Sequence, residues 1–415
     1  MVDMTVHDVA ARLGVKVDTV YAYVSRGALT ARREPGSRRS RFDPAEVETL
    51  ARRGRPRRST RPSALDLVVE TDLTTITDGR VRYRGRDAAE LAWTATFEEV
   101  AGWLWTGADA ADDDPWVAYP LLACQLAASR DRIRAAVVHA SSAEPLRADL
   151  SSSAVVGCAR ALIASMVDAV PARPESRTPA LALPDGSRTV HDSVAGRLCG
   201  RLADPRRAAR LTGAVNAALV LLTDHELASS TVAARAAASV RADVFSVVLA
   251  GLGPIAGPLH GSASVAVHEL ITDALARGPG AALSAALARS SRVPGFGHPR
   301  YPDGDPRTVP LLGLVEAAVS DSAAVRTAHE LVAAVGHRTR RLPNVDFALG
   351  VLSTAGGMPS SAGETLFTVA RSAGWIAHAI EEYAEPPLRF RARAIPRRPQ
   401  AGAPSVDSAH ARPDA

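Results

Sequence analysis

Apolar residues recur at helical spacing along most of this chain, in segments separated by short polar breaks from residue 64 onward. This spacing predicts a mainly α-helical body. A clear example is the segment from Ser262 to Ala276, which ends at the helix stop signal Gly278-Pro279. A stretch rich in proline and polar residues, from Val170 to Val190, predicts a long internal loop.

The composition supports a helical interior. Hydrophobic residues make up 47% of the 415 residues but aromatic residues only 4%, so the interior is expected to consist of Ala, Leu and Val. Ala and Leu have high helix propensity, whereas the aromatic strand formers are scarce. A chain of this length can form about two or three domains.

The first residues have the spacing of a helix-turn-helix, from Val6 to Ser25, with small Ala10 where two helices would meet and Gly14 in the turn. The positions expected to be buried are Val9, Leu13, Val15, Val20 and Tyr23. A second helix from Val17 to Ser25 would be the recognition element. It would offer a DNA groove or its phosphates the side chains of Lys16, Asp18, Thr19, Tyr21 and Arg26.

The next segment, Thr30 to Phe42, has Pro35-Gly36 between Arg32-Arg33 and Arg38-Arg39. It resembles the β-wing of the winged, MerR or excisionase-like helix-turn-helix family, and Pro44 to Ala51 would supply a third helix. Arg38 and Arg39 are therefore further candidates for DNA contact. Arginines can neutralise phosphates without reading sequence, so a solvated basic lobe or a protein-docking module remains an alternative.

Charge is concentrated at this end of the chain. Residues 1–63 hold 14 Lys and Arg against 7 Asp and Glu, a net charge of +7, which leaves about −2 for the rest of the +5 chain. The run that follows the third helix has no apolar periodicity and is expected to be a flexible basic linker. The basic character thus belongs to the N-terminal segment.

Several classes of protein do not fit the sequence. The three cysteines, Cys124, Cys158 and Cys199, form no metal or redox pattern and suit a reducing compartment. The N-terminus lacks a signal-peptide pattern, and the apolar runs at 214–222 and 244–259 are too short or too interrupted to span a bilayer. We expect a soluble, cytoplasmic protein without a metal or a tightly bound cofactor.

Three short segments in the C-terminal third carry candidate chemistry. They are Gly257-Pro258-Leu259-His260-Gly261, the run from Gly295 to His298 that leads to Asp305-Pro306-Arg307, and Pro343-Asn344-Val345-Asp346-Phe347. Together they offer two histidines, a carboxylate and an arginine in turn-rich settings. A base and an electrophile that act on one substrate can form and stabilise a carbanion.

These segments resemble the citrate synthase family. Val69 to Gly79, Tyr83 to Arg86 and Phe97 to Val100 are similar to its opening stretch; Thr223 to Leu227 and Ser230-Thr231 are similar to its oxaloacetate histidine segment; and Asn344 to Glu381 is similar to its last catalytic stretch. The resemblance covers residues 66–395. It implies a two-domain helical fold that condenses acetyl-CoA with oxaloacetate.

The expected organisation is a winged helix-turn-helix domain at 1–52, a basic linker at 53–65, a large helical domain at 66–259, a small domain that closes over the substrates at 260–370, a return to the large domain with a C-terminal arm at 371–395, and a disordered tail at 396–415. By analogy with the family, activity would require a homodimer.

The resemblance also implies roles for single residues. Asp346 would remove the proton, His260 would donate a hydrogen bond to the thioester oxygen, and His298 would polarise the oxaloacetate carbonyl. The carboxylates of oxaloacetate would bind to His225, Arg307 and Arg371, and Arg389 would enter the neighbouring subunit's site. The turn around the CoA adenine would comprise Val293, Gly295 and Gly297. Candidate phosphate ligands, none of them favoured, are Arg292, Arg300, Arg340 and Arg341.

Local sequence bears on two of these roles. His260 lies just before a predicted helix, whose positive end lowers an imidazole pKa and keeps the ring neutral. Pro343 and Asn344 are start signals for another helix, and its N-terminus would lower the pKa of Asp346 and weaken it as a base. We therefore expect desolvation to restore the basicity of Asp346.

Some residues depart from the family's pattern, namely Ala228, Ser262, Ser264, Pro299-Arg300 and Phe390. None removes a catalytic side chain, but they leave the acyl group open between acetyl and propionyl, the group used by 2-methylcitrate synthase. One methylene changes pocket discrimination by only about 1–3 kcal/mol. A transcription regulator that senses oxaloacetate or CoA through a retained site is the alternative from another class.

Overall fold

The computed structural model describes residues 4–13, 15, 17–25, 29–33, 40–52, 68–109, 115–122, 125–173, 193–257, 260–290 and 292–391. The chain divides into two compact units, Met1–Glu70 and Thr71–Ala415. The linker expected at 53–65, most of the loop expected at 170–190 and the tail expected at 396–415 lie outside the described residues. The same holds for Lys16, Arg26, Arg38 and Arg39.

The first unit combines three helices with a small antiparallel sheet. Its elements are β1 (Met4–Thr5), α1 (Val6–Leu13), α2 (Val17–Ser25), β2 (Arg32–Arg33), β3 (Ser40–Phe42) and α3 (Pro44–Arg52). The sheet has the order β1-β3-β2, with Met4 opposite Phe42 and Arg32 opposite Arg41. The helix-turn-helix and the paired strands of the wing agree with the sequence prediction, whereas β1 was not predicted.

A small hydrophobic core holds this unit together, formed by Val9, Ala10, Val20, Tyr23, Leu29, Phe42 and Val47. Thr5 and Asp8 cap the start of α1, because the Asp8 carboxylate accepts from the Thr5 amide at 2.9 Å and the Thr5 hydroxyl accepts from the Asp8 amide at 3.3 Å. An exposed bidentate ion pair joins α1 to α3, from Arg12 to Glu48 at 2.6 and 2.7 Å.

The second unit begins with three short antiparallel strands and continues, in the part of the chain that is described, as helices. The strands are β4 (Thr74–Thr77), β5 (Arg80–Tyr83) and β6 (Arg86–Asp87). The helices are α4 (Ala88–Thr94), α5 (Phe97–Thr106), α6 (Ser129–Ala143), α7 (Ser152–Ala169), α8 (Val194–Leu202), α9 (Pro205–Leu222), α10 (Ser229–Ser239), α11 (Val244–Ile255), α12 (Ala263–Arg277), α13 (Pro279–Arg289), α14 (Thr308–Ala318), α15 (Ala323–Gly336), α16 (Val345–Ala355) and α17 (Ala362–Ala384).

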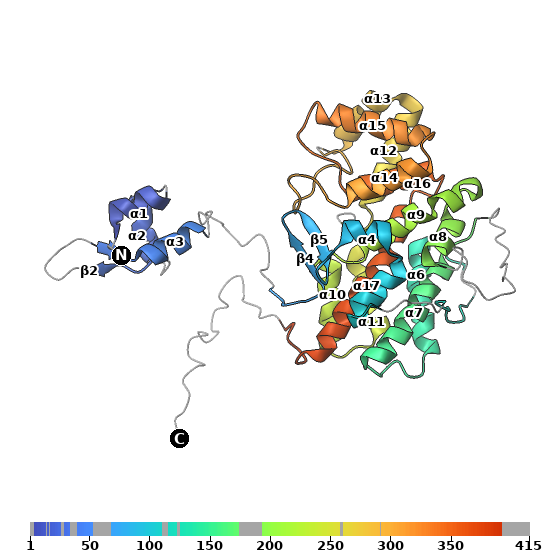
Figure 1. Ribbon diagram of the computed structural model, residues 1–415, viewed down its shortest axis with the longest axis horizontal. Helices are drawn as coiled ribbons and strands as arrows, with labels where there is room; N and C mark the ends of the chain where they lie inside the picture. Colours follow the sequence, from blue (N-terminus) through green and yellow to red (C-terminus); the bar gives the residue numbers. More distant parts are fainter. Residues whose placement is uncertain are drawn as a thin grey trace, which may run out of the picture. The chain divides into compact units, whose positions relative to one another are not determined.

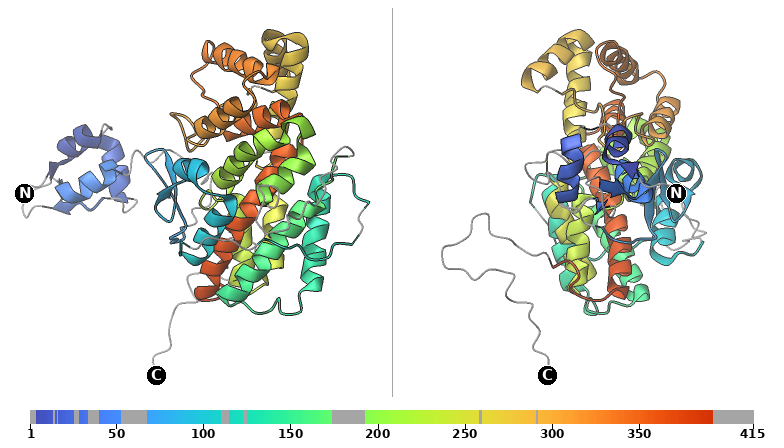
Figure 2. Two further views of the ribbon diagram at one scale, coloured as in Figure 1. Left: turned by 45° about the vertical axis from the view of Figure 1, so that its right-hand side comes forward. Right: turned by 90° about the vertical axis from the view of Figure 1, so that its left-hand side faces the viewer.

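Helix α17 is the central element of this unit. It packs against α5, α6, α7, α9, α10, α11, α12 and α16, and all of its residues from Ala362 to Ala379 are buried. Figures 1 and 2 show it as the red helix that runs through the interior, while α12 to α16, in gold and orange, gather at one end of the unit. Residues on α17 are therefore surrounded by protein along most of its length.

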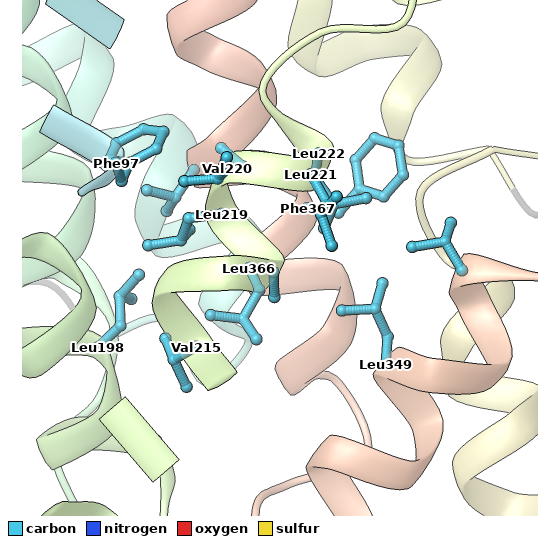
Figure 3. Close-up of a cluster of buried hydrophobic side chains, with 14 of the residues drawn as sticks. Phe97, Leu198, Val215, Leu219, Val220, Leu221, Leu222, Leu349, Leu366 and Phe367 are labelled. Carbon is cyan, nitrogen blue, oxygen red and sulfur yellow. The ribbon is translucent and has the colours of Figure 1, made fainter. Parts of the chain in front are cut away.

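Part of the hydrophobic core of the second unit lies where α9 meets α17. Figure 3 shows Val215, Leu219 and Leu222 of α9 in one cluster with Leu366 and Phe367 of α17. Each such leucine contributes roughly 1.5–3 kcal/mol through burial. Gly374 lets the two helices approach, because a Cβ atom there would lie 2.2 Å from the carbonyl oxygen of Thr223. The turn after α9 is thereby held directly against α17.

Among the described helices, only α7 has the length and the apolar composition that could cross a membrane. Half of that window is buried inside the protein, and α7 packs against α5, α6, α8, α11 and α17. Its position in the core accounts for its apolar character.

Candidate active site

The turn between α9 and α10 presents His225. The Tyr83 hydroxyl donates to the Val220 carbonyl at 3.0 Å, which fixes the end of α9. The Nε2 atom of His225 lies 2.6 Å from the hydroxyl of Tyr301. Burial, with Arg307 and Arg371 nearby, lowers the pKa of His225 well below its ordinary value. The imidazole is therefore neutral at neutral pH.

His298 lies in a second turn, which is built on two glycines with left-handed backbone, Gly295 at φ +79° and Gly297 at φ +80°. The Arg300 amide donates to Nδ1 of His298 at 3.2 Å. A backbone N–H can only donate, so Nδ1 accepts and the neutral ring carries its proton on Nε2. Burial, and then Arg307, lowers the pKa of His298 and keeps it neutral.

A buried ion pair joins this turn to the start of α16. Arg307 donates to both carboxylate oxygens of Asp305, at 2.9 and 2.8 Å. The same carboxylate accepts from the Val345 amide at 3.0 Å. Although burial would raise the pKa of Asp305, the Arg307 guanidinium holds it below its usual range. Asp305 thus fixes Arg307 and the residue next to Asp346 together.

Asp346 occupies the first turn of α16, where Asn344 is the N-cap and accepts from the Phe347 amide. Its Oδ1 atom is buried and has no hydrogen-bond partner among the described residues. Burial raises the pKa of Asp346 to about 6, and this exceeds the opposing effect of Arg307. The expected loss of basicity at the helix N-terminus is therefore outweighed by desolvation, without any further closure.

His260 precedes α12, as its sequence setting predicted. Its Nε2 atom lies 2.8 Å from the Ser230 hydroxyl, and its ring meets that of Phe367 edge-on with centroids 5.6 Å apart. Burial, and to a smaller extent Arg371, lowers the pKa of His260 to about 4. A neutral imidazole in this position can donate one hydrogen bond to a substrate oxygen.

Arg371 of α17 is a buried cation whose guanidinium is only partly hydrogen-bonded within the described residues. Its side chain is 1% exposed, and its Nε donates to the Leu222 carbonyl at 2.9 Å. Its Nη2 has no hydrogen-bond partner among the described residues. Burial lowers the pKa of Arg371 to about 10, although the nearby carboxylate of Asp224, which is not hydrogen-bonded to it, opposes this effect. A buried guanidinium in this state favours an anionic ligand, because unpaired buried charge is costly.

The other candidates are placed less centrally. Arg389, expected to act in a neighbouring subunit, pairs with Glu382 of its own chain at 2.8 and 2.9 Å. Gly295, proposed for the CoA turn, has no room for a side chain, since a Cβ atom would lie 2.8 Å from Val267; Val293 beside it is half-buried.

Of the candidates for DNA contact that are described, Thr19 is half-buried and Tyr21 is 49% exposed.

Sequence reasoning missed Tyr301 and gave no role to Ser230 or Asp305. Tyr301 contacts His225, its ring lies 4.8 Å from that of His298, and Arg307 lies over its face at 5.6 Å. An aromatic residue three positions after His298 was the available signal. The described residues contain no group of three or more His, Cys, Asp and Glu arranged to hold a metal ion.

Comparison of this sequence with known protein families identifies two matching family profiles and several relatives. The profile described as "Citrate synthase, C-terminal domain" matches residues 117–393, and one described as "Helix-turn-helix domain" matches residues 4–55. The citrate synthase of Haloferax volcanii is 36% identical over 183 residues, which cover 42% of this chain and 48% of that protein. The 2-methylcitrate synthase of Mycobacterium tuberculosis strain H37Rv is 26% identical, over 72% of this chain and 80% of the relative. The matched region thus spans about half the length of the first relative.

Solved structures share the fold. The citrate synthase of Thermotoga maritima matches with a TM-score of 0.59 and 24% identity, covering 80% of this chain and 98% of that one. The citrate synthase of Thermoplasma acidophilum, solved with carboxymethyl coenzyme A and oxaloacetate, matches with a TM-score of 0.63 and 23% identity, covering 82% and 97%. The mainly helical architecture predicted from the sequence is confirmed, and so is the N-terminal helix-turn-helix.

Proposed function

The chain belongs to the citrate synthase family, and we propose on this basis that it condenses acetyl-CoA with oxaloacetate to give citrate and CoA. The observation that carries the proposal is Arg371, a buried cation whose Nη2 has no hydrogen-bond partner among the described residues, together with Asp346, whose buried Oδ1 also has none there. Propionyl-CoA is the alternative acyl donor, because relatives of both specificities match the chain.

Oxaloacetate would bind between the two buried arginines. One carboxylate of the dianion would accept hydrogen bonds from Arg371, whose planar guanidinium suits a carboxylate. Arg307 would serve the other carboxylate through its edge that faces away from Asp305, and His225 would donate to the same substrate. Burial, and then Arg307 and Arg371, lower the pKa of His225, which supports the placement of both arginines around one site.

The first chemical step is removal of a proton from the methyl group of the thioester. Asp346 would take this proton on Oδ1, and a pKa of about 6 leaves the carboxylate ionised at neutral pH yet more basic than an ordinary aspartate. His260 would donate a hydrogen bond to the thioester oxygen as the enol or enolate forms. Its pKa of about 4 keeps it a neutral donor throughout.

The second step forms the carbon–carbon bond. The enol carbon attacks the ketone of oxaloacetate, whose oxygen is polarised by the Nε2–H of His298, the tautomer favoured by the Arg300 amide. The alkoxide takes up a proton, which balances the one that Asp346 removed from the methyl group, and the product is citryl-CoA. Water then cleaves the thioester to release citrate and CoA, so that one water is consumed for each turnover.

We propose further that residues 260–370 close over the substrates and that the active form is a homodimer with Arg389 in the partner's site. This role would require Arg389 to leave Glu382, with which it pairs in the single chain. Mixing inactive Asp346→Asn and Arg389→Ala subunits tests it. Activity recovered in mixed dimers would support a shared site, and no recovery would place Arg389 in a structural role.

The N-terminal unit is proposed to bind DNA, with Tyr21 and Thr19 of α2 facing the duplex together with Lys16, Arg26, Arg38 and Arg39. The helix-turn-helix profile match and the net charge of the first 63 residues support this proposal. A regulator that senses oxaloacetate is the competing function. It would need the arginines for binding but would have no use for Asp346.

A thiol-release assay on the full-length protein separates these functions. We expect CoA release that depends on oxaloacetate, with acetyl-CoA or propionyl-CoA as the second substrate, and no release when oxaloacetate is omitted. Comparing kcat/KM for the two thioesters identifies the acyl group. No release with either thioester, together with DNA binding that changes on addition of oxaloacetate, would replace the enzyme with the regulator.

A further inference from the structure

Two adjacent residues of one turn hold two adjacent residues of another. Arg300 forms an ion pair with Glu226, and Tyr301, the next residue, reaches His225 at 2.6 Å. Both contacts join the turn after α9 to the turn that carries His298. The two histidines proposed to bind oxaloacetate are thus connected through residues that flank them in sequence.

Glu226 is itself fixed in place at its other oxygen. Its Oε1 accepts from the Ile76 amide of β4 at 2.9 Å, while Oε2 faces Arg300. Its backbone lies in the left-handed region at φ +52°, which is uncommon for a residue with a side chain. Anchoring the carboxylate at both oxygens holds this turn and therefore the orientation of His225.

Arg300 acts on His298 as well, through its backbone. Its amide donates to Nδ1 of His298 at 3.2 Å, while its side chain reaches the other turn. One residue therefore contacts His298 through its main chain and the neighbour of His225 through its guanidinium. Any shift of Arg300 would move the two histidines relative to each other.

We propose that Arg300 is a positioning residue, which through Glu226 sets the spacing of His225 and His298 for oxaloacetate. The proposal rests on the proposed function, since it assigns these histidines to that substrate. The side chains of Arg300 and Glu226 are 57% and 24% exposed. Exposed pairs contribute little individually, so the expected change in oxaloacetate KM is about threefold.

Two other roles for Arg300 make different predictions. A ligand of a CoA phosphate would change the KM of the thioester and leave that of oxaloacetate unaltered. A simple source of positive charge would attract the dianion, so that removing the negative charge of Glu226 would improve oxaloacetate binding. The positioning role predicts that Arg300→Ala and Glu226→Gln both weaken oxaloacetate binding, because either variant breaks the same contact.

The experiment measures KM for each substrate in full-length Arg300→Ala, Arg300→Lys and Glu226→Gln proteins. We expect a rise of about threefold in oxaloacetate KM for the alanine and glutamine variants, partial recovery for lysine, and an unchanged thioester KM. The differences should shrink in 0.5 M salt, since an exposed pair is screened. Arg277→Ala removes an exposed ion pair with Asp273 in the same unit and is the matched control.

The thermal shift that oxaloacetate alone produces supplies a second reading, independent of turnover. Arg300→Ala and Glu226→Gln should each show a smaller oxaloacetate-induced shift than the parent protein. The melting temperatures of the ligand-free proteins should be unchanged. A thioester-specific effect, a tighter oxaloacetate KM in Glu226→Gln, or no change in Arg300→Ala would overturn the positioning role in an active enzyme. If the parent protein neither turns over nor responds to oxaloacetate, the proposed function fails and this inference fails with it.

Discussion

Helix α17 holds two buried arginine sites that differ in how their charge is compensated. Toward its C-terminal end, the fully buried Arg235 of α10 lies against Glu382 at 3.0 Å, Glu381 at 2.5 Å and the Nδ1 of His378 at 2.7 Å. Near the middle, Arg371 has only the Leu222 carbonyl as a hydrogen-bond partner for Nε and none for Nη2 among the described residues.

This difference in charge compensation distinguishes an arginine that stabilises the fold from one that is available to bind a ligand. A buried ion pair with matched partners holds helices together, and its removal leaves an uncompensated charge. A buried cation without a directly bonded carboxylate costs the folded protein free energy, and an anionic ligand can offset that cost. We therefore propose that the Arg235 cluster serves stability and that Arg371 and Asp346 serve substrate binding and catalysis.

The largest effect is expected for Asp346→Asn, which removes the proposed base and keeps the shape of the side chain. We expect kcat to fall by about 10² to 10⁴, the usual contribution of a general base, while oxaloacetate still protects the protein against thermal unfolding. Steady-state CoA release and thermal shift measure the two. Exposed Asp321→Asn is the control and should match the parent; loss of oxaloacetate protection would show that the base is misassigned.

Arg235→Met tests the structural half of the comparison. Removing Arg235 leaves the fully buried Glu382 with Arg389 as its remaining ion-pair partner, so we expect a cost near the lower end of the about 3–5 kcal/mol for breaking a buried pair. Guanidinium unfolding should show this loss. Arg277→Met, which breaks only an exposed pair with Asp273, should change stability by less than about 0.5 kcal/mol. Equal stability of the two variants would mean that the Arg235 cluster does not stabilise the fold.

Arg371→Met tests the other half. Arg371 forms no direct ion pair, and the nearby Asp224 keeps its contact with His378, so we expect less destabilisation than for Arg235→Met. Oxaloacetate affinity should fall by about tenfold to a hundredfold with the loss of charged hydrogen bonds. Isothermal titration with oxaloacetate alone measures the affinity. Destabilisation equal to that of Arg235→Met, with affinity retained, would make Arg371 a structural residue and remove the contrast.

Asp346 should also affect stability in a pH-dependent way. Burial raises its pKa to about 6, so the folded protein binds this proton more tightly than the unfolded chain does. Ionisation therefore destabilises the fold as pH rises from about 4 to 6, and Asn, which cannot ionise, avoids this cost. We expect Asp346→Asn to be about 1–2 kcal/mol more stable at pH 7, after discounting for partial exposure, with the gain absent at pH 4.

Calorimetry at the two pH values measures this difference. An equal gain at both would point to a packing effect, and no gain at pH 7 would mean that Asp346 ionises without cost in the folded protein. A positive result would identify the base by its energetic penalty. Glu381 should not share this penalty, because burial is outweighed there by the hydrogen bond from Arg235, which lowers its pKa.

The sequence predicted secondary-structure elements and motifs better than it predicted which side chains contact one another. Helical periodicity and the stop at Gly278-Pro279 placed α12 to within one residue at each end, and Asn344 was identified as a start signal for α16. Such features depend on neighbours in the chain. The roles of Asp346 and His260 were inferred from the resemblance to the family's motifs. The raised pKa of Asp346 and the lowered pKa of His260 are consistent with those roles. The roles themselves stay predictions.

Long-range contacts could not be predicted in the same way. Arg235 lies 147 positions from Glu382, and nothing in the local sequence of α10 distinguishes it from a solvated surface arginine. Desolvation of Asp346 depends on several segments packing together, whereas the helix N-terminus visible in the sequence indicated the opposite shift. The pairing of Arg300 with Glu226 likewise exists only once two separate turns meet.

Deleting residues 1–63 is expected to have the smallest effect on the surroundings of Arg235 and Arg371, and therefore on catalysis. Arg235, Arg371 and all the partners described for them belong to the unit Thr71–Ala415. We expect kcat and the oxaloacetate KM to stay within about twofold of the parent, while salt-sensitive retention on a DNA column is lost, because that retention depends on phosphate neutralisation by the basic segment. A large fall in kcat in the truncated protein would mean that the first unit acts on the catalytic unit, and that Arg371 is held in place by more than the residues around α17.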